Sequence, residues 1–253
     1  MLGGEIGISY EIGALIATAV FMIYTATSGL FQKESPDVIG LQEAMKCQLD
    51  YIDYTCPEYA HVGEDRDGGI EGGETMAIYY RKEKFDLLDH GTFWLSESPD
   101  IVSRGWDAAC NRTMTWARME MKYNGRKFFY VNTHLDSDGA LARKEGLKLI
   151  LDKIAEKNTD NLPVVLTGDF NVTPDNSVLK VLDNAKMLDA RTTAEETDDL
   201  ATFNGWGKEE ARVIDYIYYR GFSSCPEYET IVKQYANIQY ISDHYPIVAR
   251  LMF

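Results

Sequence analysis

Residues 164–171 read VVLTGDFN, an apolar run that ends in a glycine and two polar side chains separated by a phenylalanine. A short apolar run of this kind predicts a strand that is buried on both faces. Gly168 permits a close approach by a neighbouring backbone. Because side chains alternate along a strand, Asp169 and Asn171 share one face and Phe170 takes the other. The stretch therefore predicts a buried strand that presents a carboxylate beside an amide, with a turn capped by these side chains as the alternative.

Strand-like and helix-like segments alternate on both sides of this stretch. The clearest helix is predicted over residues 141–157, where Leu147, Ile150 and Ile154 recur with helical spacing. No internal repeat or linker interrupts the chain, so we expect a single domain over residues 1–253, with residues 1–33 atypical, built as stacked sheets with helices outside them. A shorter helix is predicted over residues 178–182, a hairpin turn at Asn124-Gly125, and strands over residues 37–42, 76–81, 92–96, 113–121, 127–133, 163–169, 212–220, 230–235 and 247–253.

The composition is that of an acidic globular protein. The chain has 253 residues, 45% of them apolar and 26% charged, which excludes a disordered chain, a collagen-like fibre and a coiled coil. Its formal net charge of -15 disfavours a protein that grips a long DNA backbone but suits an enzyme that holds a divalent cation. The four cysteines form no CxxC pair, so we expect free buried thiols rather than a zinc site or a disulfide scaffold.

The segment from Ile12 to Gln32 carries no charged side chain. It is long enough to span a bilayer, but its many Gly, Ala, Ser and Thr residues make it only moderately apolar. No Lys or Arg precedes it, so it lacks the basic start of a secretory signal. We predict a buried helix here, with a membrane or export segment and an altered or mis-framed terminus as the alternatives.

Further polar groups stand at or inside apolar segments. Glu43 follows the run VIGLQ, His134 ends an aromatic segment, and Asp243 and His244 precede the last predicted strand. Taken singly, these residues also fit ordinary helix-start acids and caps. Asp215 lies inside the apolar run VIDYI, where a carboxylate is costly unless it is paired. A buried imidazole is its natural partner, so we predict that Asp215 orients His244.

The ordered set of motifs IGLQEA, NTHLD, GDFN, IDYI and SDHYP resembles that of the endonuclease/exonuclease/phosphatase superfamily, and it covers residues 36–253. The resemblance implies an α/β (α+β) fold: a four-layer α/β/β/α sandwich of two packed, mostly antiparallel sheets flanked by helices. Residues 91–119, GTFWLSESPDIVSRGWDAACNRTMTWARM, resemble a bacterial branch related to the deadenylase-like group. In that branch an arginine matching Arg112 lies near the site.

The resemblance implies a site for Mg²⁺ or Mn²⁺, hard cations that prefer oxygen ligands. Glu43 would bind the ion, and Asp243 would support the ion or the nucleophile. Asp169 would align or deprotonate the attacking water. Whether one ion or two are bound stays open.

The same resemblance implies groups that act on the phosphate. His134, Asn171 and Arg112 would bind the substrate's phosphate oxygens. Asp215 would orient His244, which would stabilise the developing negative charge.

One departure from the family pattern concerns the first strand, which carries a metal-site asparagine in the family. The nearest match here is residues 8–13, ISYEIG, where Glu11 stands in place of the asparagine. Either Glu11 serves as an oxygen ligand to the metal, or the first strand is displaced and the site is weakened.

We therefore expect a metal-dependent phosphoesterase that hydrolyses a phosphomonoester or phosphodiester by attack of water. The alternatives are a nuclease acting on DNA or RNA and a catalytically impaired binding or membrane-tethered homologue. The expected substrate is a phosphorylated small molecule or a short nucleic acid, bound by a monomer with no stable protein partner. Residues 12–32 leave membrane contact open, and the compartment, cytoplasmic or exported, is open too. A basic cleft is one further hypothesis, made by Arg104, Arg112 and Arg118 with Trp106 and Trp116.

Overall fold

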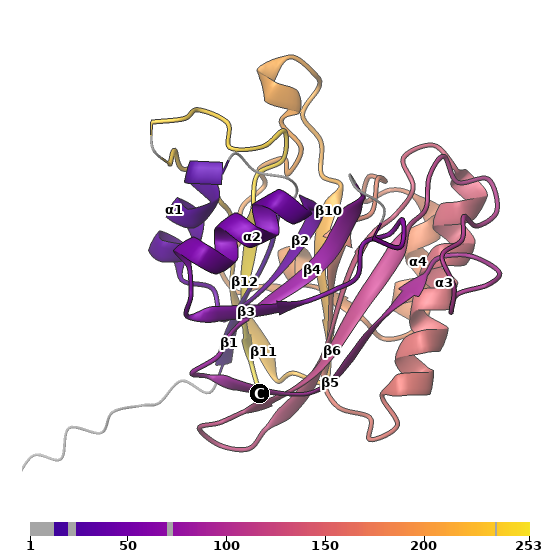
Figure 1. Cartoon of the computed structure of the whole chain (residues 1–253), viewed down its shortest axis with the longest axis horizontal. Coiled ribbons are helices and arrows are strands. Elements are labelled where there is room, and N and C mark those ends of the chain that lie inside the picture. Colours follow the sequence, from indigo (N-terminus) through magenta and orange to yellow (C-terminus); the bar gives the residue numbers. More distant parts are fainter. Residues whose placement is uncertain (1–12, 20–23, 70–72, 236) are drawn as a thin grey trace, which may run out of the picture.

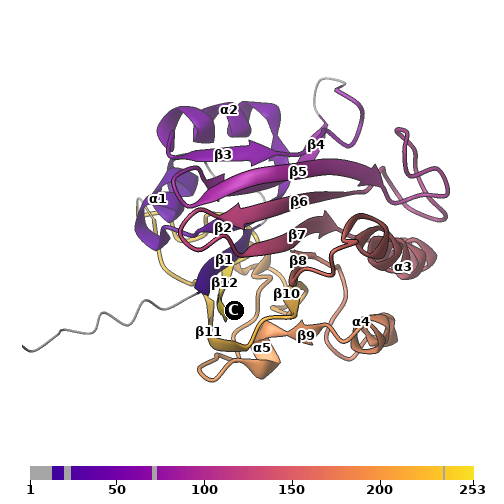
Figure 2. The same cartoon turned by 90° about the horizontal axis from the view of Figure 1, so that it is seen from below.

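The computed structural model describes residues 13–19, 24–69, 73–235 and 237–253, and these form four layers (Figure 1). Two six-stranded sheets pack against each other. Figure 2 shows helices α1 (Tyr24–Glu34) and α2 (Lys46–Thr55) outside the first sheet, and α3 (Ala140–Lys157) and α4 (Lys180–Asn184) outside the second. This α/β/β/α sandwich is the fold class that the sequence predicted.

The first sheet is mostly antiparallel, and its only parallel pair among the described residues joins β1 to β2. Its strand order is β11 (Ser224–Thr230), β12 (Ile247–Met252), β1 (Gly13–Ala19), β2 (Val38–Met45), β4 (Glu74–Arg81) and β3 (Tyr59–Val62).

The second sheet has the same character, with β7 and β8 as the parallel pair. Its strand order is β5 (Phe85–Trp94), β6 (Thr113–Met121), β7 (Lys127–His134), β8 (Val164–Asp169), β10 (Asp215–Arg220) and β9 (Leu188–Asp189). Short helical turns complete the fold at α5 (Ala190–Thr193), Ser177–Leu179 and Gly205–Gly207.

The core fills three spaces between the layers. Alternation along each strand sends neighbouring side chains to different spaces: in β2, Val38 packs between the sheets, whereas Ile39 packs under α1 and α2. In β8, Val165 faces the first sheet and Leu166 faces α3, whose Ile150 is fully buried. Every residue of β8 is buried, as the apolar run predicted.

A buried polar cluster crosses between the two sheets next to their polar end. From the second sheet, Asn132 Nδ2 donates to Leu41 O (2.8 Å) and Ala77 O (3.0 Å) of the first. Gln42 Nε2 donates to Asn132 Oδ1 (2.5 Å), and Thr167 Oγ1 lies 3.2 Å from the same oxygen. A buried polar group is stabilised when it is hydrogen-bonded, so these contacts fix how the sheets sit on each other.

The N-terminal segment differs from the predicted single helix over residues 12–32. Residues 13–19 form β1, which pairs with β2 on one side and β12 on the other, and α1 begins only at Tyr24. An uncharged run suits a strand bonded on both edges as well as it suits a buried helix, and periodicity alone does not separate them. In the part of the chain that the structure describes, no helix combines the length and apolar character needed to cross a membrane.

Other sequence predictions need smaller corrections. The strand predicted over residues 230–235 is wrong: β11 ends at Thr230, because Ile231 and Tyr235 leave the sheet and pack into the core beneath α1. Strand β3 and helix α2 were not predicted. All four cysteines are free, but only Cys56 and Cys225 are buried: Cys110 is partly exposed and Cys47 is exposed.

Candidate active site

Five polar residues meet at one end of the sandwich because of the strand directions. Glu43 lies near the end of β2, and Glu74 begins the antiparallel strand β4. His134 and Asp169 end the parallel strands β7 and β8. Asp215 begins β10, opposite Asp169 in the antiparallel pairing. Both sheets therefore contribute to one polar centre.

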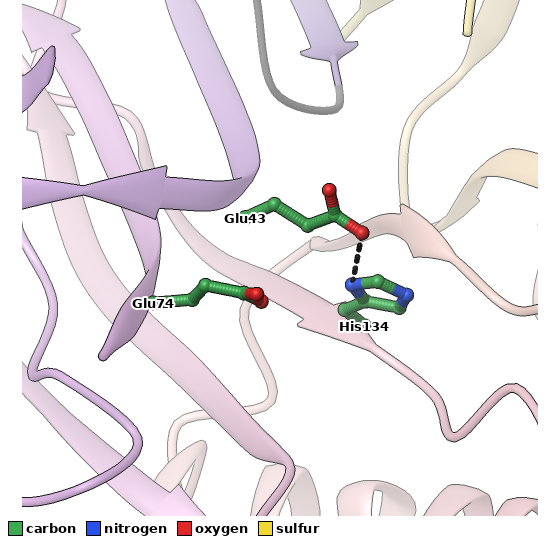
Figure 3. A group of neighbouring side chains, drawn as sticks. All are labelled: Glu43, Glu74 and His134. Carbon is green, nitrogen blue, oxygen red and sulfur yellow. Dashed lines mark ion pairs between the residues drawn. The ribbon is translucent and has the colours of Figure 1, made fainter. Parts of the chain in front are cut away.

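The first group of side chains joins the two sheets. Potential ligand atoms of Glu43, Glu74 and His134 all lie within 4.8 Å of one another, and His134 Nδ1 is 3.8 Å from Glu43 Oε1 (Figure 3). Glu43 has a φ of 56°, and the pairing of β2 with β4 shifts register between Leu41 and Ala44. A bulge of this kind changes the direction of a side chain, and at this bulge the Glu43 side chain points toward His134. Glu43 is thus a bulge residue of β2, not the first-turn acid of a helix.

The second group lies within the second sheet and the segment before β12. Atoms of Asp169, Asp215 and His244 also lie within 4.8 Å of one another, and all three side chains are buried. His244 Nδ1 is 2.8 Å from Asp215 Oδ2, and the same oxygen accepts a 2.5 Å hydrogen bond from Thr202 Oγ1. Asp215 therefore fixes the orientation of the His244 imidazole, and Thr202 fixes the orientation of Asp215.

Asp169 and Asn171 connect the two groups. His134 Nε2 lies 3.3 Å from Asp169 Oδ2, and His244 Nε2 lies 3.8 Å from it. Asn171 donates through its backbone N–H to Asp169 Oδ1 (2.8 Å), and its amide lies 3.0 Å from His134 Nε2. A Cβ at Gly168 would overlap Thr133 O of β7, so glycine permits the close strand approach that places Asp169 beside His134.

Two acids of this centre, Glu43 and Asp169, have raised pKa values. Burial raises the pKa of Glu43, and the carboxylates of Glu74 and Asp243 raise it further. Burial also raises the pKa of Asp169 to about 7, an effect to which Asp215 adds and which the His244 cation and the Asn171 N–H oppose. These shifts express crowded negative charge in a space with little water.

The two imidazoles are driven in opposite directions. Burial, followed by the charges of Arg112, His244 and Arg66, lowers the pKa of His134 well below its usual range. His134 is therefore neutral, and its contact with Asp169 is not an ion pair. Burial also lowers the pKa of His244, but the charge and hydrogen bond of Asp215, together with the charges of Asp169 and Asp243, outweigh that effect and raise the pKa to about 9.

These residues fit a divalent cation. Glu43 and Glu74 supply carboxylate oxygens, which Mg²⁺ and Mn²⁺ prefer. His134 Nδ1 is buried and makes no hydrogen bond within the described chain, so a polar atom facing Glu43 lacks a partner. A cation would offset the repulsion that raises the pKa of Glu43.

One sequence-predicted metal residue, Asp243, stands apart from these groups, and another is not among the described residues. The Asp243 carboxylate accepts from Ser242 Oγ at 3.2 Å and belongs to neither group, although its charge raises the pKa of both Glu43 and His244. Glu11 lies outside the described residues. In the pairing of β1 with β2, Ala19 is opposite Leu41, so the end of β1 that lies level with Glu43 is its C-terminal end.

Arg112 is close to the centre, but the predicted basic cleft is not formed. Arg112 is 8% exposed, and its charge lowers the pKa of both Glu43 and His134. Arg118 instead pairs with Asp160 at 2.9 Å, and Trp116 is buried and stacked on Phe129. Six positions along a strand separate two residues by about 20 Å, which places Arg118 far along β6 from Arg112.

Glu74 was missed by sequence reasoning. It stands two residues before the strand predicted from Met76, so it shared with Glu43 the signal of a carboxylate at the end of an apolar strand. The glycine-rich stretch around it hid that signal, and only the antiparallel pairing with β2 brings it beside Glu43.

The sequence profile of the Endonuclease/Exonuclease/phosphatase family matches residues 24–244. The chain belongs to this family, whose members are divalent-metal-dependent hydrolases of phosphoester bonds. It is 26% identical over 265 residues to Nocturnin of Drosophila melanogaster, an alignment covering 85% of this chain and 39% of that protein.

Two solved structures show how far the likeness extends. An endonuclease/exonuclease/phosphatase family protein from Bacteroides thetaiotaomicron superposes with a TM-score of 0.90 at 28% identity, covering 96% of this chain and 98% of that one. A mannosyl-6-phosphatase from Bacteroides thetaiotaomicron VPI-5482 gives a TM-score of 0.88 at 29% identity, covering 95% of this chain and 100% of that one.

Proposed function

We propose that the protein is a phosphoesterase that hydrolyses a phosphomonoester or phosphodiester by attack of water and depends on Mg²⁺ or Mn²⁺. The observation that carries this proposal is the meeting of half-buried Glu43 with buried His134, Asp169 and His244 in one centre, reached from both sheets.

Glu43 and Glu74 are the proposed metal-binding residues, with Asp243 as a nearby support. A bound divalent cation supplies Lewis-acid stabilisation of phosphoryl oxygens and of the negative charge that develops during the reaction. Glu43 turns toward the centre from its bulge, and Glu74 reaches the same place from the neighbouring strand.

Asp169 is the proposed group that aligns and deprotonates the water. A general base works best when its pKa lies near the working pH, and the pKa of about 7 meets that condition. The hydrogen bond from the Asn171 backbone fixes one carboxylate oxygen and leaves Oδ2 facing both imidazoles.

The remaining residues act on the phosphoryl oxygens. His244 stays protonated at neutral pH, and its Nδ1 is held by Asp215, so Nε2–H is free to donate to an oxygen on which charge develops. The Arg112 guanidinium is a further proposed donor. The Asn171 amide lies 3.0 Å from His134 Nε2 and donates to Leu135 O at 2.9 Å, so it would donate to a phosphoryl oxygen by exchanging one of these partners.

The substrate is proposed to be small. A net charge of -15 repels a long polyanion, and the similar mannosyl-6-phosphatase supports a phosphorylated sugar as one choice. A nuclease activity and a catalytically impaired homologue are the alternative outcomes of the test.

The test is a substrate panel with Mg²⁺, Mn²⁺ or a chelator. The panel contains hexose 6-phosphates, nucleotides, inositol phosphates, a phosphodiester lipid headgroup and oligonucleotides. We expect metal-dependent turnover of a small phosphoester, lowered roughly 10²–10⁴-fold or more in Asp169→Asn, because the variant keeps the shape and loses the base.

Unchanged turnover in Asp169→Asn would remove Asp169 from the mechanism. Cleavage of oligonucleotides alone, with a steep dependence on salt, would favour the nuclease. A wild-type protein inactive on every substrate would contradict the proposed function.

A further inference from the structure

A second arginine, which no motif singled out, stands beside the centre. Arg66 Nη1 lies 2.5 Å from Glu74 Oε2, and its side chain is 16% exposed. Glu74 is the carboxylate whose ligand atom lies within 4.8 Å of those of Glu43 and His134 (Figure 3). Arg66 therefore brings a positive charge to the same place as the proposed metal-binding residues.

Arg112 brings a positive charge from another loop. Its Nε donates to Asp136 Oδ2 at 3.2 Å. That carboxylate is fixed in turn by backbone N–H groups of Ala109 (3.1 Å), Asp138 (3.1 Å) and Gly139 (2.7 Å). A guanidinium has five N–H donors. Within the described chain the two terminal nitrogens of Arg112 make no hydrogen bond, so they are available to a ligand.

The two loops are fastened to each other beside these arginines. Asn111, which precedes Arg112, donates through Nδ2 to Asp67 Oδ1 at 2.9 Å, and Asp67 follows Arg66. The Arg66 carbonyl accepts from Trp94 Nε1 at 2.6 Å, and its N–H donates to Glu74 O at 2.9 Å. These contacts hold the two loops, and Glu74 and Asp136 hold the guanidinium groups of Arg66 and Arg112, so both are positioned before a substrate arrives, which lowers the entropy lost on binding.

Arg66 has more donors than its partner Glu74 uses. Its Nε is buried without a hydrogen bond in the described part of the chain, and it lies 3.8 Å from Asp67 Oδ2, beyond hydrogen-bond reach.

We infer that Arg66 and Arg112 together bind the non-bridging oxygens of a phosphomonoester dianion, and that this pair makes the site selective for monoesters over diesters. The inference rests on the proposed function and adds its substrate class. A monoester presents three non-bridging oxygens and about two negative charges, whereas a diester presents two oxygens and one charge. Guanidinium groups match such oxygens geometrically, and each charge-assisted contact is strong.

The experiment compares p-nitrophenyl phosphate with bis(p-nitrophenyl) phosphate, which share a leaving group, in the presence of Mg²⁺ or Mn²⁺. In Arg66→Gln we expect kcat/KM for the monoester to fall about 10- to 100-fold, the range for losing a charged hydrogen bond. The diester should lose no more than roughly threefold, because it lacks the third oxygen that the lost contact binds. The kcat/KM of Arg66→Lys for the monoester should lie between those of wild type and Arg66→Gln, since lysine keeps the positive charge and loses the planar set of guanidinium donors.

Arg118→Gln is the matched control, because it removes the same charge far along β6 and should leave the monoester-to-diester ratio unchanged. A second readout needs no turnover: the Kd of inorganic phosphate, measured by calorimetry with Mg²⁺ present, should rise at least tenfold in Arg66→Gln. If that variant does not fold, Arg66→Lys supplies both measurements.

Equal losses on both esters, or an unchanged phosphate Kd, would overturn the inference and leave Arg66 as a counter-ion of Glu74. Absence of turnover in the wild type would instead contradict the proposed function, while the phosphate Kd would still decide whether Arg66 binds the anion.

Discussion

At the scale of single residues, the centre keeps one buried imidazole neutral and the other protonated. His134 is buried near the Arg112 and Arg66 cations, whereas His244 is buried against the Asp215 carboxylate. The neighbouring charge, more than burial, therefore decides which imidazole carries a proton.

This arrangement predicts a bell-shaped pH profile. Asp169 must lose its proton to act as a base, so kcat/KM should rise as the pH passes about 7. His244 must keep its proton to stabilise charge, so kcat/KM should fall as the pH passes about 9. The measurement is kcat/KM against pH at saturating metal, with the best substrate of the panel.

Asp215→Asn is the control for the alkaline limb. Removing the carboxylate lowers the pKa of His244, so that limb should move to lower pH. The same carboxylate raises the pKa of Asp169, so the acid limb should move to lower pH as well. An alkaline limb that does not move would show that another group controls it.

At the scale of secondary-structure elements, the sequence predicted those elements whose signal is local. Helix α3 was expected over residues 141–157 and spans Ala140–Lys157, because its buried face repeats with helical spacing. Strand β8 was expected from its apolar run and is buried throughout.

The elements that sequence reasoning missed depend on pairing rather than on pattern. Strand β1 is an uncharged run that the edges of β2 and β12 select as a strand. Glu74 gains its place only when β4 pairs antiparallel to β2, and Arg66 gains its place only through Glu74 and Trp94. These contacts join residues from different segments of the chain, so no regular spacing in the sequence predicts them.

Two glycine substitutions should have opposite effects on stability, because Gly40 lies against the second sheet and Gly146 has room for a methyl group. A methyl group at Gly40 would overlap Asn132 Oδ1 and lie 2.6 Å from Thr167 Oγ1, so Gly40→Ala should lower the free energy of unfolding by about 1–3 kcal/mol. At Gly146 in α3 the added methyl would lie 3.5 Å from Leu95 Cδ1, an ordinary contact.

Gly146→Ala should therefore leave stability unchanged or raise it by up to about 1 kcal/mol, as expected for a helix interior. Urea unfolding of both variants measures the two changes. A Gly40→Ala protein as stable as wild type would show that Asn132 and Thr167 can move to accommodate the methyl group.

At the scale of the whole molecule, the proposed metal site lies where the two sheets meet. We propose that residues 1–253 fold as one domain, because residues from both sheets share one hydrophobic cluster, including Val38, Ile78, Tyr130 and Val165. Thermal unfolding should then show one transition.

Mg²⁺ should raise the temperature of that transition. A ligand present at 100 times its Kd stabilises the folded state by about 2.7 kcal/mol, which for a chain of this size is about 5–10 °C. Calorimetric melts with Mg²⁺ and with a chelator measure the shift, and Glu43→Gln should reduce it. An equal shift in Glu43→Gln would place the ion elsewhere.

The division of the centre between two layers has a consequence for inactivation. Glu43 and Glu74 belong to the first sheet, and His134, Asp169 and Asp215 belong to the second. A slip of the layers by less than the width of a side chain would separate the acids from the imidazoles while every helix and strand survived. Mild denaturant should therefore abolish turnover before circular dichroism detects any loss of structure, which would make enzymatic rate the earliest reporter of damage to the interior.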